Sequence, residues 1–246
     1  MNIVHSCSMR QHLVAIHQSN FFPWLGYFAK IFQADTFIFL DDAQFSTGTW
    51  SNRVKVLLRE PSWITMPIVR NYHGVRNFQE MEINESTPWR EKICKTLQTF
   101  YGKAPFFKKL FPLCEPLILN PESSLLAYNI QAIKGILAIL QWEKNTLRMA
   151  SEFAITSQST QRLIDLVKAV GGNAYLAGGG AGTYQEDYLF AEQGIDLVYL
   201  NFHHPVYTQT GQQFVPGLSI FDALFNMGEG QTRRWLTRSE KCTEDD

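Results

Sequence analysis

Residues 13–40 constrain the fold most strongly, because they contain the pattern of a strand, a loop, a helix and a second strand. Leu13–Ile16 is a short apolar run, and after Tyr27 the apolar residues recur at helical spacing. Thr36–Leu40 then combines β-branched, aromatic and aliphatic residues, which is typical of a buried strand. Two strands joined by a helix in this way pair in parallel, so the segment predicts an α/β fold.

A second unit of the same kind is indicated in the last third of the chain. Ala174–Ala177 and Leu197–Leu200 are short strand-like runs, and Tyr184–Glu192 between them has helical spacing. A Gly-rich turn, residues 178–182, follows the first of these strands. Together the two units predict a mainly parallel, Rossmann-like sheet flanked by helices.

The middle of the chain has a different pattern. Asn52–Val56 and Trp63–Val69 alternate like half-buried strands and predict a hairpin. The first helix after them should have Thr87 as its N-cap and Pro88 at its first position. We expect a single domain over residues 1–246, with a mostly helical insertion at about 86–150 and a frayed tail at about 239–246. Helices are expected at Trp89–Tyr101, Ala104–Leu113, Ser123–Leu140 and Ser159–Val170, and from Ser219 to just before Gly228.

Charge and composition exclude several classes of function. The formal net charge is −1, with 22 Lys+Arg against 23 Asp+Glu, so no overall basic field favours nucleic-acid binding. No apolar stretch approaches the roughly 20 residues that span a bilayer. Residues 1–12 lack the apolar core of a secretory signal, and the four cysteines show no C-x-x-C spacing. We therefore expect a cytoplasmic protein with free thiols.

Ionisable residues directly follow several predicted strands, where open α/β sheets bind their ligands. Asp41 and Asp42 alternate in direction if the strand continues, so only one of them should face a ligand while the other caps a loop. Tandem histidines likewise point apart, and the pattern leaves open whether His203 or His204 faces the site. The alternative is that these are hydrogen-bonded loop residues without a chemical role. The candidate catalytic residues are His17, Asp41, Asp42 and His204, and no metal-ligand set is expected.

Other residues in the same segments are candidate ligand contacts. Glycine lacks a Cβ, so the Gly-rich turn can bring backbone N–H groups close to a phosphate. Its spacing matches neither a dinucleotide fingerprint nor a Walker A motif, and a merely tight turn is the alternative. The candidate phosphate-binding residues are Gly178, Gly179, Gly180, Gly182 and Tyr184. The candidate substrate-binding residues are Gln18, Asn20, Trp24, Tyr27, Asn52, Arg53, Tyr207, Gln209 and Asp222.

Several of these segments together resemble the WbqC-like family of bacteria. The resemblance runs from about Leu13 to Gly228, and Ser19 and Ala43 replace what are usually Pro and Val in the family. It implies a place in O-antigen or other surface-polysaccharide biosynthesis, with acylation or aminoacylation of an amino sugar as the suspected chemistry. The segments that carry it are Ile16–Tyr27, Phe39–Phe45, Asn52–Arg53, Trp63–Pro67, His204–Gln209 and Leu218–Asp222.

These observations lead to three functional hypotheses. The first is a transferase that forms an amide on a nucleotide-linked amino sugar, using an acyl or aminoacyl donor that is free or carrier-bound. In it a histidine oriented by an aspartate takes a proton from the amine. The second is a nucleotide-activating ligase with Mg²⁺ as its cofactor. It is suggested by a weaker similarity to nucleotidyltransferases and pantothenate synthetases, whose two motif histidines are replaced here within Trp24–Tyr27. The third is a non-enzymatic module that binds a glycan precursor.

Overall fold

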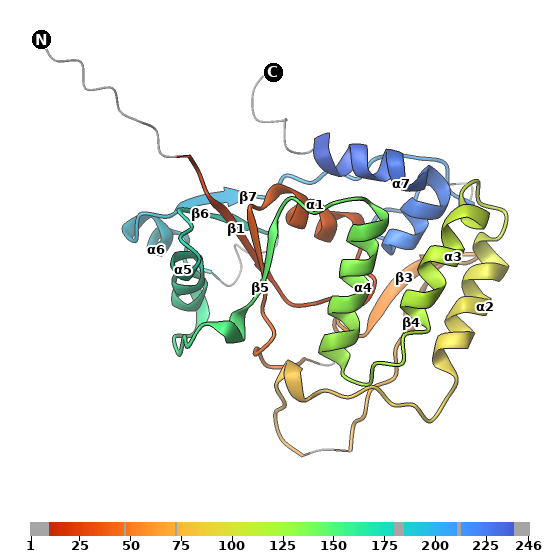
Figure 1. Ribbon diagram of the computed structural model, residues 1–246, viewed down its shortest axis with the longest axis horizontal. Coiled ribbons are helices and arrows are strands. Elements are labelled where there is room, and N and C mark those ends of the chain that lie inside the picture. The colour runs from red at the N-terminus through yellow and green to blue at the C-terminus, as the bar shows by residue number, and fades with distance from the viewer. Residues whose placement is uncertain (1–9, 47, 72, 180–184, 211–212, 239–246) are drawn as a thin grey trace, which may run out of the picture.

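A parallel sheet forms the framework of the protein (Figure 1). The computed structural model describes residues 10–46, 48–71, 73–179, 185–210 and 213–238. Within these ranges the sheet has five strands in the order β5-β2-β1-β6-β7, and every neighbouring pair is parallel. The strands are β1 (Leu13–His17), β2 (Thr36–Phe39), β5 (Thr146–Met149), β6 (Ala174–Ala177) and β7 (Asp196–Tyr199).

Different helices cover the two faces of the sheet, because successive residues of a strand point to opposite sides. Val14, Ile16 and Tyr175 pack in one cluster with the buried residues of α5 and α6. Ala15 and Phe37 belong to a larger cluster that continues into the other helices. The helices of the first cluster are α5 (Ser159–Ala169) and α6 (Asp187–Glu192), and those of the second are α1 (Leu25–Gln33), α2 (Trp89–Tyr101), α3 (Phe107–Ile118), α4 (Leu125–Ile139) and α7 (Ile220–Arg238).

A separate antiparallel hairpin, β3 (Arg53–Leu57) and β4 (Pro61–Thr65), lies among the helices of the larger cluster (Figure 1). The backbone of Ser219, just before α7, donates to the carbonyl of Lys55 at 2.8 Å and fixes the hairpin against that helix. Short 3₁₀ helices, η1 (Phe78–Glu80) and η2 (Ala150–Glu152), lie in the connections.

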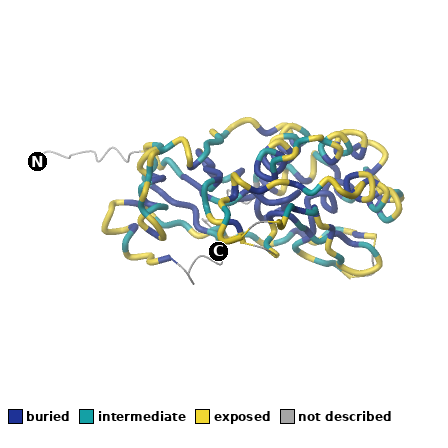
Figure 2. Tube along the Cα trace, turned by 90° about the horizontal axis from the view of Figure 1, so that it is seen from below, coloured by how far each residue is buried: buried dark blue, intermediate teal, exposed yellow. Residues whose placement is uncertain are grey.

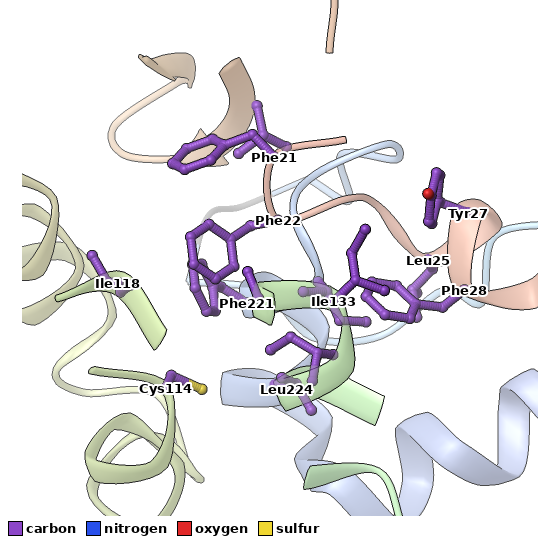
Figure 3. Close-up of a cluster of buried hydrophobic side chains, with 14 of the residues drawn as sticks. Phe21, Phe22, Leu25, Tyr27, Phe28, Cys114, Ile118, Ile133, Phe221 and Leu224 are labelled. Atoms are coloured by element: carbon purple, nitrogen blue, oxygen red, sulfur yellow. The ribbon is translucent and has the colours of Figure 1, made fainter. Parts of the chain in front are cut away.

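Aromatic side chains from distant parts of the sequence make up much of the larger cluster. The rings of Phe22 and Phe221 lie 4.5 Å apart between centroids, and Figure 3 shows them beside Ile133 and Leu224. Figure 2 shows that buried residues run through the interior of the molecule while exposed ones lie on its outer segments. The segment that follows β1 is therefore anchored in the core of the protein.

The structure confirms both parallel strand–helix–strand units and the hairpin, and it differs from the predictions elsewhere. Strand β5, a half-exposed edge strand that pairs only with β2, was not expected, because polar residues interrupt its apolar pattern. Strand β4 ends at Thr65, before Pro67, which has no N–H for a ladder. Pro88, and not Thr87, occupies the N-cap of α2.

Three helices also differ in their bounds from the predictions. Helix α3 runs to Ile118 and contains two prolines, whereas the prediction ended it at Leu113. Helix α6 begins at Asp187, and residues 180–184 before it lie outside the described residues. Helix α7 stops being helical at Gly228, where φ is 78°, as expected, but a second helical segment continues beyond it.

Candidate functional site at the carboxyl edge of the sheet

The strand order creates a switch point between β1 and β6. From β1 the chain proceeds to β2 and β5 on one side, and then crosses to β6 and β7 on the other. The connections after β1 and β6 therefore diverge, and open α/β sheets bind ligands in the crevice between such strands. The residues that follow these two strands, His17–Trp24 and Gly178–Gly179, define what we call the switch-point site.

His17, the last residue of β1, is held as a neutral imidazole. Its Nδ1 lies 3.0 Å from the carbonyl oxygen of Gln18, which can only accept, so Nδ1 carries the proton and Nε2 has the free lone pair. Burial, and then the nearby charge of Lys30, lower the pKa of His17 from 6.5 to about 4, although the bond to Gln18 opposes this. Near neutral pH the ring is therefore uncharged, and the lone pair of Nε2 is free to accept a hydrogen bond.

Tyr27, in the first turn of α1, fixes the orientation of His17. The two rings meet edge to face with centroids 5.1 Å apart, and the Tyr27 hydroxyl donates to the carbonyl of Gln18 at 3.0 Å. Burial raises the pKa of Tyr27 well above 10, so its hydroxyl remains a donor. The same carbonyl thus holds both His17 and Tyr27 in place.

Lys30 is a buried cation that the sequence analysis did not select. Its side chain lies on α1, is 4% exposed and donates from Nζ to the carbonyl of Ile16 at 2.9 Å. Its ammonium also lies over the ring of Tyr175, 5.8 Å from the centroid. Burial lowers its pKa from 10.5 to about 7. Its position three residues after Tyr27, which puts both side chains on one face of the helix, was the available signal.

An aromatic group stands at the N-terminus of α1. The ring of Trp24 lies 5.2 Å from that of His204, with a tilt of 31°, and 5.6 Å from that of Phe202. A Cβ at position 26 would approach the Trp24 ring to 2.1 Å, so Gly26 allows this indole to lie back over the helix. Burial lowers the pKa of His204, which keeps this ring uncharged near neutral pH.

The loop between β1 and α1 is strained and firmly held. Phe22 has φ of 38°, a conformation that costs about 1–3 kcal/mol in a residue other than glycine. The hydroxyl of Ser219 donates to the Phe22 carbonyl at 2.9 Å, and the Asn129 amide of α4 donates to the carbonyls of Ser19 and Ser51. Asn20 in the same loop is buried. The surrounding core thus fixes the loop in one shape.

The two aspartates after β2 have different partners. Asp41 is 1% exposed and accepts from the Gln79 amide at 2.7 Å and from the backbone and hydroxyl of Ser151 at 2.9 and 2.6 Å, so it joins η1 to η2. Asp42 pairs with Arg162 of α5 at 2.5 Å. Its Oδ1 is buried and has no partner among the described residues. The geometry thus places Asp41 in the scaffold and leaves Asp42 an oxygen for a ligand.

Gly178 and Gly179 follow β6 at the other side of the crevice. A Cβ at either position would meet no heavy atom within 4 Å among the described residues, and neither glycine has a positive φ. Packing and backbone conformation therefore do not require glycine here, whereas close approach of a ligand to the backbone would. Gly180, Gly182 and Tyr184 lie outside the described residues.

Asn52 and Arg53 lie at the start of β3, in the hairpin and not at the sheet edge. Asn52 is buried, and its amide donates to the carbonyl of Met66 at 3.0 Å. This bond joins the start of β3 to the residue that follows β4. Arg53 donates to the carbonyl of Gly48 and lies over the ring of Trp63, 4.4 Å from the centroid.

Asp222 is the centre of a buried polar network. It is fully buried and accepts from the hydroxyls of Tyr101 and Tyr207 at 2.9 and 2.7 Å, and from the amide of Gln209 at 2.9 Å. Burial raises its pKa, and the hydrogen bonds oppose the shift. The fold thus brings together three residues predicted to bind substrate, but their side chains hydrogen-bond to one another. These residues are Tyr207, Gln209 and Asp222. Tyr101, from the distant helix α2, had no local signal in the sequence.

Among the described residues, no group of three His, Cys, Asp or Glu side chains is placed to hold a metal ion. None of the helices that the structure describes is long and apolar enough to cross a membrane.

Comparisons with known proteins identify a family. The model of the WbqC-like protein family matches residues 18–234. The uncharacterized protein Rv1507c of Mycobacterium tuberculosis is 27% identical over 217 residues, which cover 87% of this chain and 94% of that protein. No solved structure matches the chain significantly.

Proposed function

The chain belongs to the WbqC-like protein family, and we propose that it is a transferase that forms an amide on a nucleotide-linked amino sugar for surface-polysaccharide synthesis. One observation carries the proposal: His17 is a neutral imidazole at the switch point, with its tautomer fixed by Gln18. Its low pKa makes His17 a weak base, so in this proposal it accepts the proton only after the amine nitrogen has attacked the carbonyl and become cationic and acidic.

The proposed reaction uses the switch-point site and Asp42, which follows the neighbouring strand β2. The amine nitrogen of the sugar attacks the carbonyl carbon of an acyl or aminoacyl donor, a C–N bond forms, and the bond to the leaving group breaks. Nε2 of His17 accepts the proton that the amine loses. The free oxygen of Asp42 accepts a hydrogen bond from the sugar, and the backbone at Gly178 and Gly179 approaches the phosphates.

The aromatic group at α1 supports a ring-shaped ligand. Trp24 and His204 present neighbouring, uncharged rings at the N-terminus of α1. Flat apolar rings with few polar groups are typical of small-molecule sites, where they fix the orientation of a ligand. In this proposal a base or a sugar ring of the ligand stacks on Trp24.

A thermal-shift screen combined with two histidine variants tests the proposal. A ligand at 100 times its Kd adds about 2.7 kcal/mol of stability, which should raise the midpoint of a chain of this size by roughly 5–10 °C. We expect this shift with UDP-glucosamine, and amide formation with acyl-CoA or aminoacyl donors detected by mass spectrometry. His17→Gln should lower turnover about 100-fold or more without abolishing the thermal shift.

The control is His203→Gln, which changes an exposed histidine in the same loop as His204. It should leave turnover unchanged. A shift with ATP and Mg²⁺ but none with UDP-glucosamine would reject the transferase in favour of the activating ligase. Equal turnover of the His17 variant and the wild type would remove His17 from the mechanism.

A further inference from the structure

A second cleft lies away from the switch-point site, between β4 and the first half of α2. Its volume is about 590 Å³, which is within the usual range for small-molecule sites. It adjoins a second hollow of about 640 Å³ along α2, and both are lined by Pro88, Lys92 and Thr96. The cleft therefore opens into a groove that follows the helix.

One wall of the cleft is an exposed indole flanked by cations. Trp63 is 41% exposed, and its ring lies 5.1 Å from that of Trp50 at an angle of 58°. Arg53 and Lys55 lie over the ring of Trp63, 4.4 and 5.2 Å from its centroid. An exposed tryptophan offers an apolar face, and the surrounding cations favour a negatively charged ligand.

The interior of the cleft supplies a donor without a partner. Trp89, at the start of α2, is 4% exposed and lines the cleft, and its Nε1 has no hydrogen-bond partner among the described residues. Nε of Arg53, beside the cleft, is also buried and unpartnered there. A buried donor left unpaired costs about 1–3 kcal/mol, so the Trp89 indole in the lining favours a ligand that supplies an acceptor.

Two threonines in an otherwise largely apolar lining can bind hydroxyl groups of a ligand. Thr65 and Thr87 line the cleft and can both donate and accept. The indoles of Trp50 and Trp63 are inclined, so they do not form a parallel pair that could sandwich a nucleobase. Lys92 lies on the cleft wall, and Glu91 is confined to the adjoining hollow.

We propose that this cleft binds an acidic saccharide, with its sugar ring on Trp63 and its phosphate or carboxylate at Lys92. Its hydroxyl oxygens accept from the Trp89 indole, and the groove along α2 takes a further sugar unit. The site is independent of the proposed transfer reaction, because it shares no residue with the switch-point site.

Titrations followed by calorimetry and tryptophan fluorescence test the proposal. The probes are galacturonic acid and mannose phosphate, with galactose as the neutral control and uridine monophosphate as the competing class. We expect both acids to bind more tightly at low ionic strength than at about 0.15 M salt. Galactose should bind at least tenfold more weakly than either acid.

Two pairs of variants locate the site. Trp63→Ala should raise the Kd of galacturonic acid at least tenfold, and Trp235→Ala, which removes a similarly exposed indole from α7, should not. Lys92→Gln should raise the Kd about threefold and reduce its dependence on salt, whereas Lys108→Gln on α3 should do neither. Both lysines are exposed, so these variants should fold even if a tryptophan variant does not.

Three results would overturn the inference: no binding of either acid, tighter binding of uridine monophosphate than of both acids, or equal effects of the test and control variants. Because none of these measurements uses turnover, failure of the transferase proposal would leave this result unaffected.

Discussion

Replacing Lys30 with methionine removes a buried charge while keeping a side chain of similar length. Lys30 is 4% exposed, and its ammonium contacts one carbonyl and one aromatic ring and forms no ion pair with a carboxylate of the described residues. We therefore predict that Lys30→Met stabilises the protein at pH 7, although it removes a hydrogen bond.

The magnitude follows from the pKa of Lys30, which burial lowers from 10.5 to about 7. One pKa unit corresponds to about 1.4 kcal/mol, so holding this group in the folded state costs about 4 kcal/mol at pH 7. Loss of the hydrogen bond to the Ile16 carbonyl destabilises the variant by about 1–2 kcal/mol and so offsets part of this gain. The variant should gain about 2–3 kcal/mol, or roughly 4–12 °C in midpoint.

The sign of the pH dependence provides a second check. Between about pH 7 and 10.5 the unfolded wild type binds more protons than the folded one, so its stability rises with pH in this window. The variant lacks the Lys30 amine and therefore this pH dependence. Its advantage should therefore shrink by about 2 kcal/mol between pH 7 and pH 9.

Urea denaturation at the two pH values measures both effects, with the exposed Lys108→Met as a control that should change neither. A less stable Lys30 variant at pH 7, or an advantage that does not change with pH, would refute the reasoning. NMR titration of the same variant should show a pKa of His17 above its wild-type value of about 4, because the charge of Lys30 contributes to lowering it.

Three further predictions concern the scaffold. Asp222→Ala should lower the free energy of unfolding by about 3–5 kcal/mol in urea, because it removes a buried acceptor of three hydrogen bonds and leaves the fully buried Tyr101 hydroxyl without its acceptor, and a loss below about 1 kcal/mol would contradict the network. Gly26→Ala should force the ring of Trp24 away from α1 and lower the midpoint by several degrees, and an unchanged midpoint would show that the ring moves freely. Burial raises the pKa of Cys94 to about 11 and of Cys114 to about 12. Mass spectrometry should therefore find both thiols unmodified by N-ethylmaleimide until denaturant is added, and rapid labelling at pH 7 would disprove their burial.

Much of the fold follows from patterns that are local in sequence. The apolar runs at β1, β2 and β6 identified the central strands, because a strand buried on both faces must be apolar throughout. Both edge strands are half-exposed, but β7 kept an apolar run that identified it, whereas the polar residues Thr146 and Arg148 interrupt β5 and removed that signal.

The sequence by itself determined the parallel sheet, the hairpin and the segments that follow the strands, including His17 and Gly178. Tertiary structure alone decided which polar groups in those segments have hydrogen-bond partners within the protein and which do not. In the sequence Asp41 and Asp42 were equal candidates, and only the folded structure shows that Asp41 accepts hydrogen bonds from Gln79 and Ser151. Likewise, only the folded structure shows that Asp222 accepts a hydrogen bond from Tyr101 of α2. The physical reason is that burial and hydrogen-bond satisfaction depend on partners far away along the chain, which local spacing does not encode.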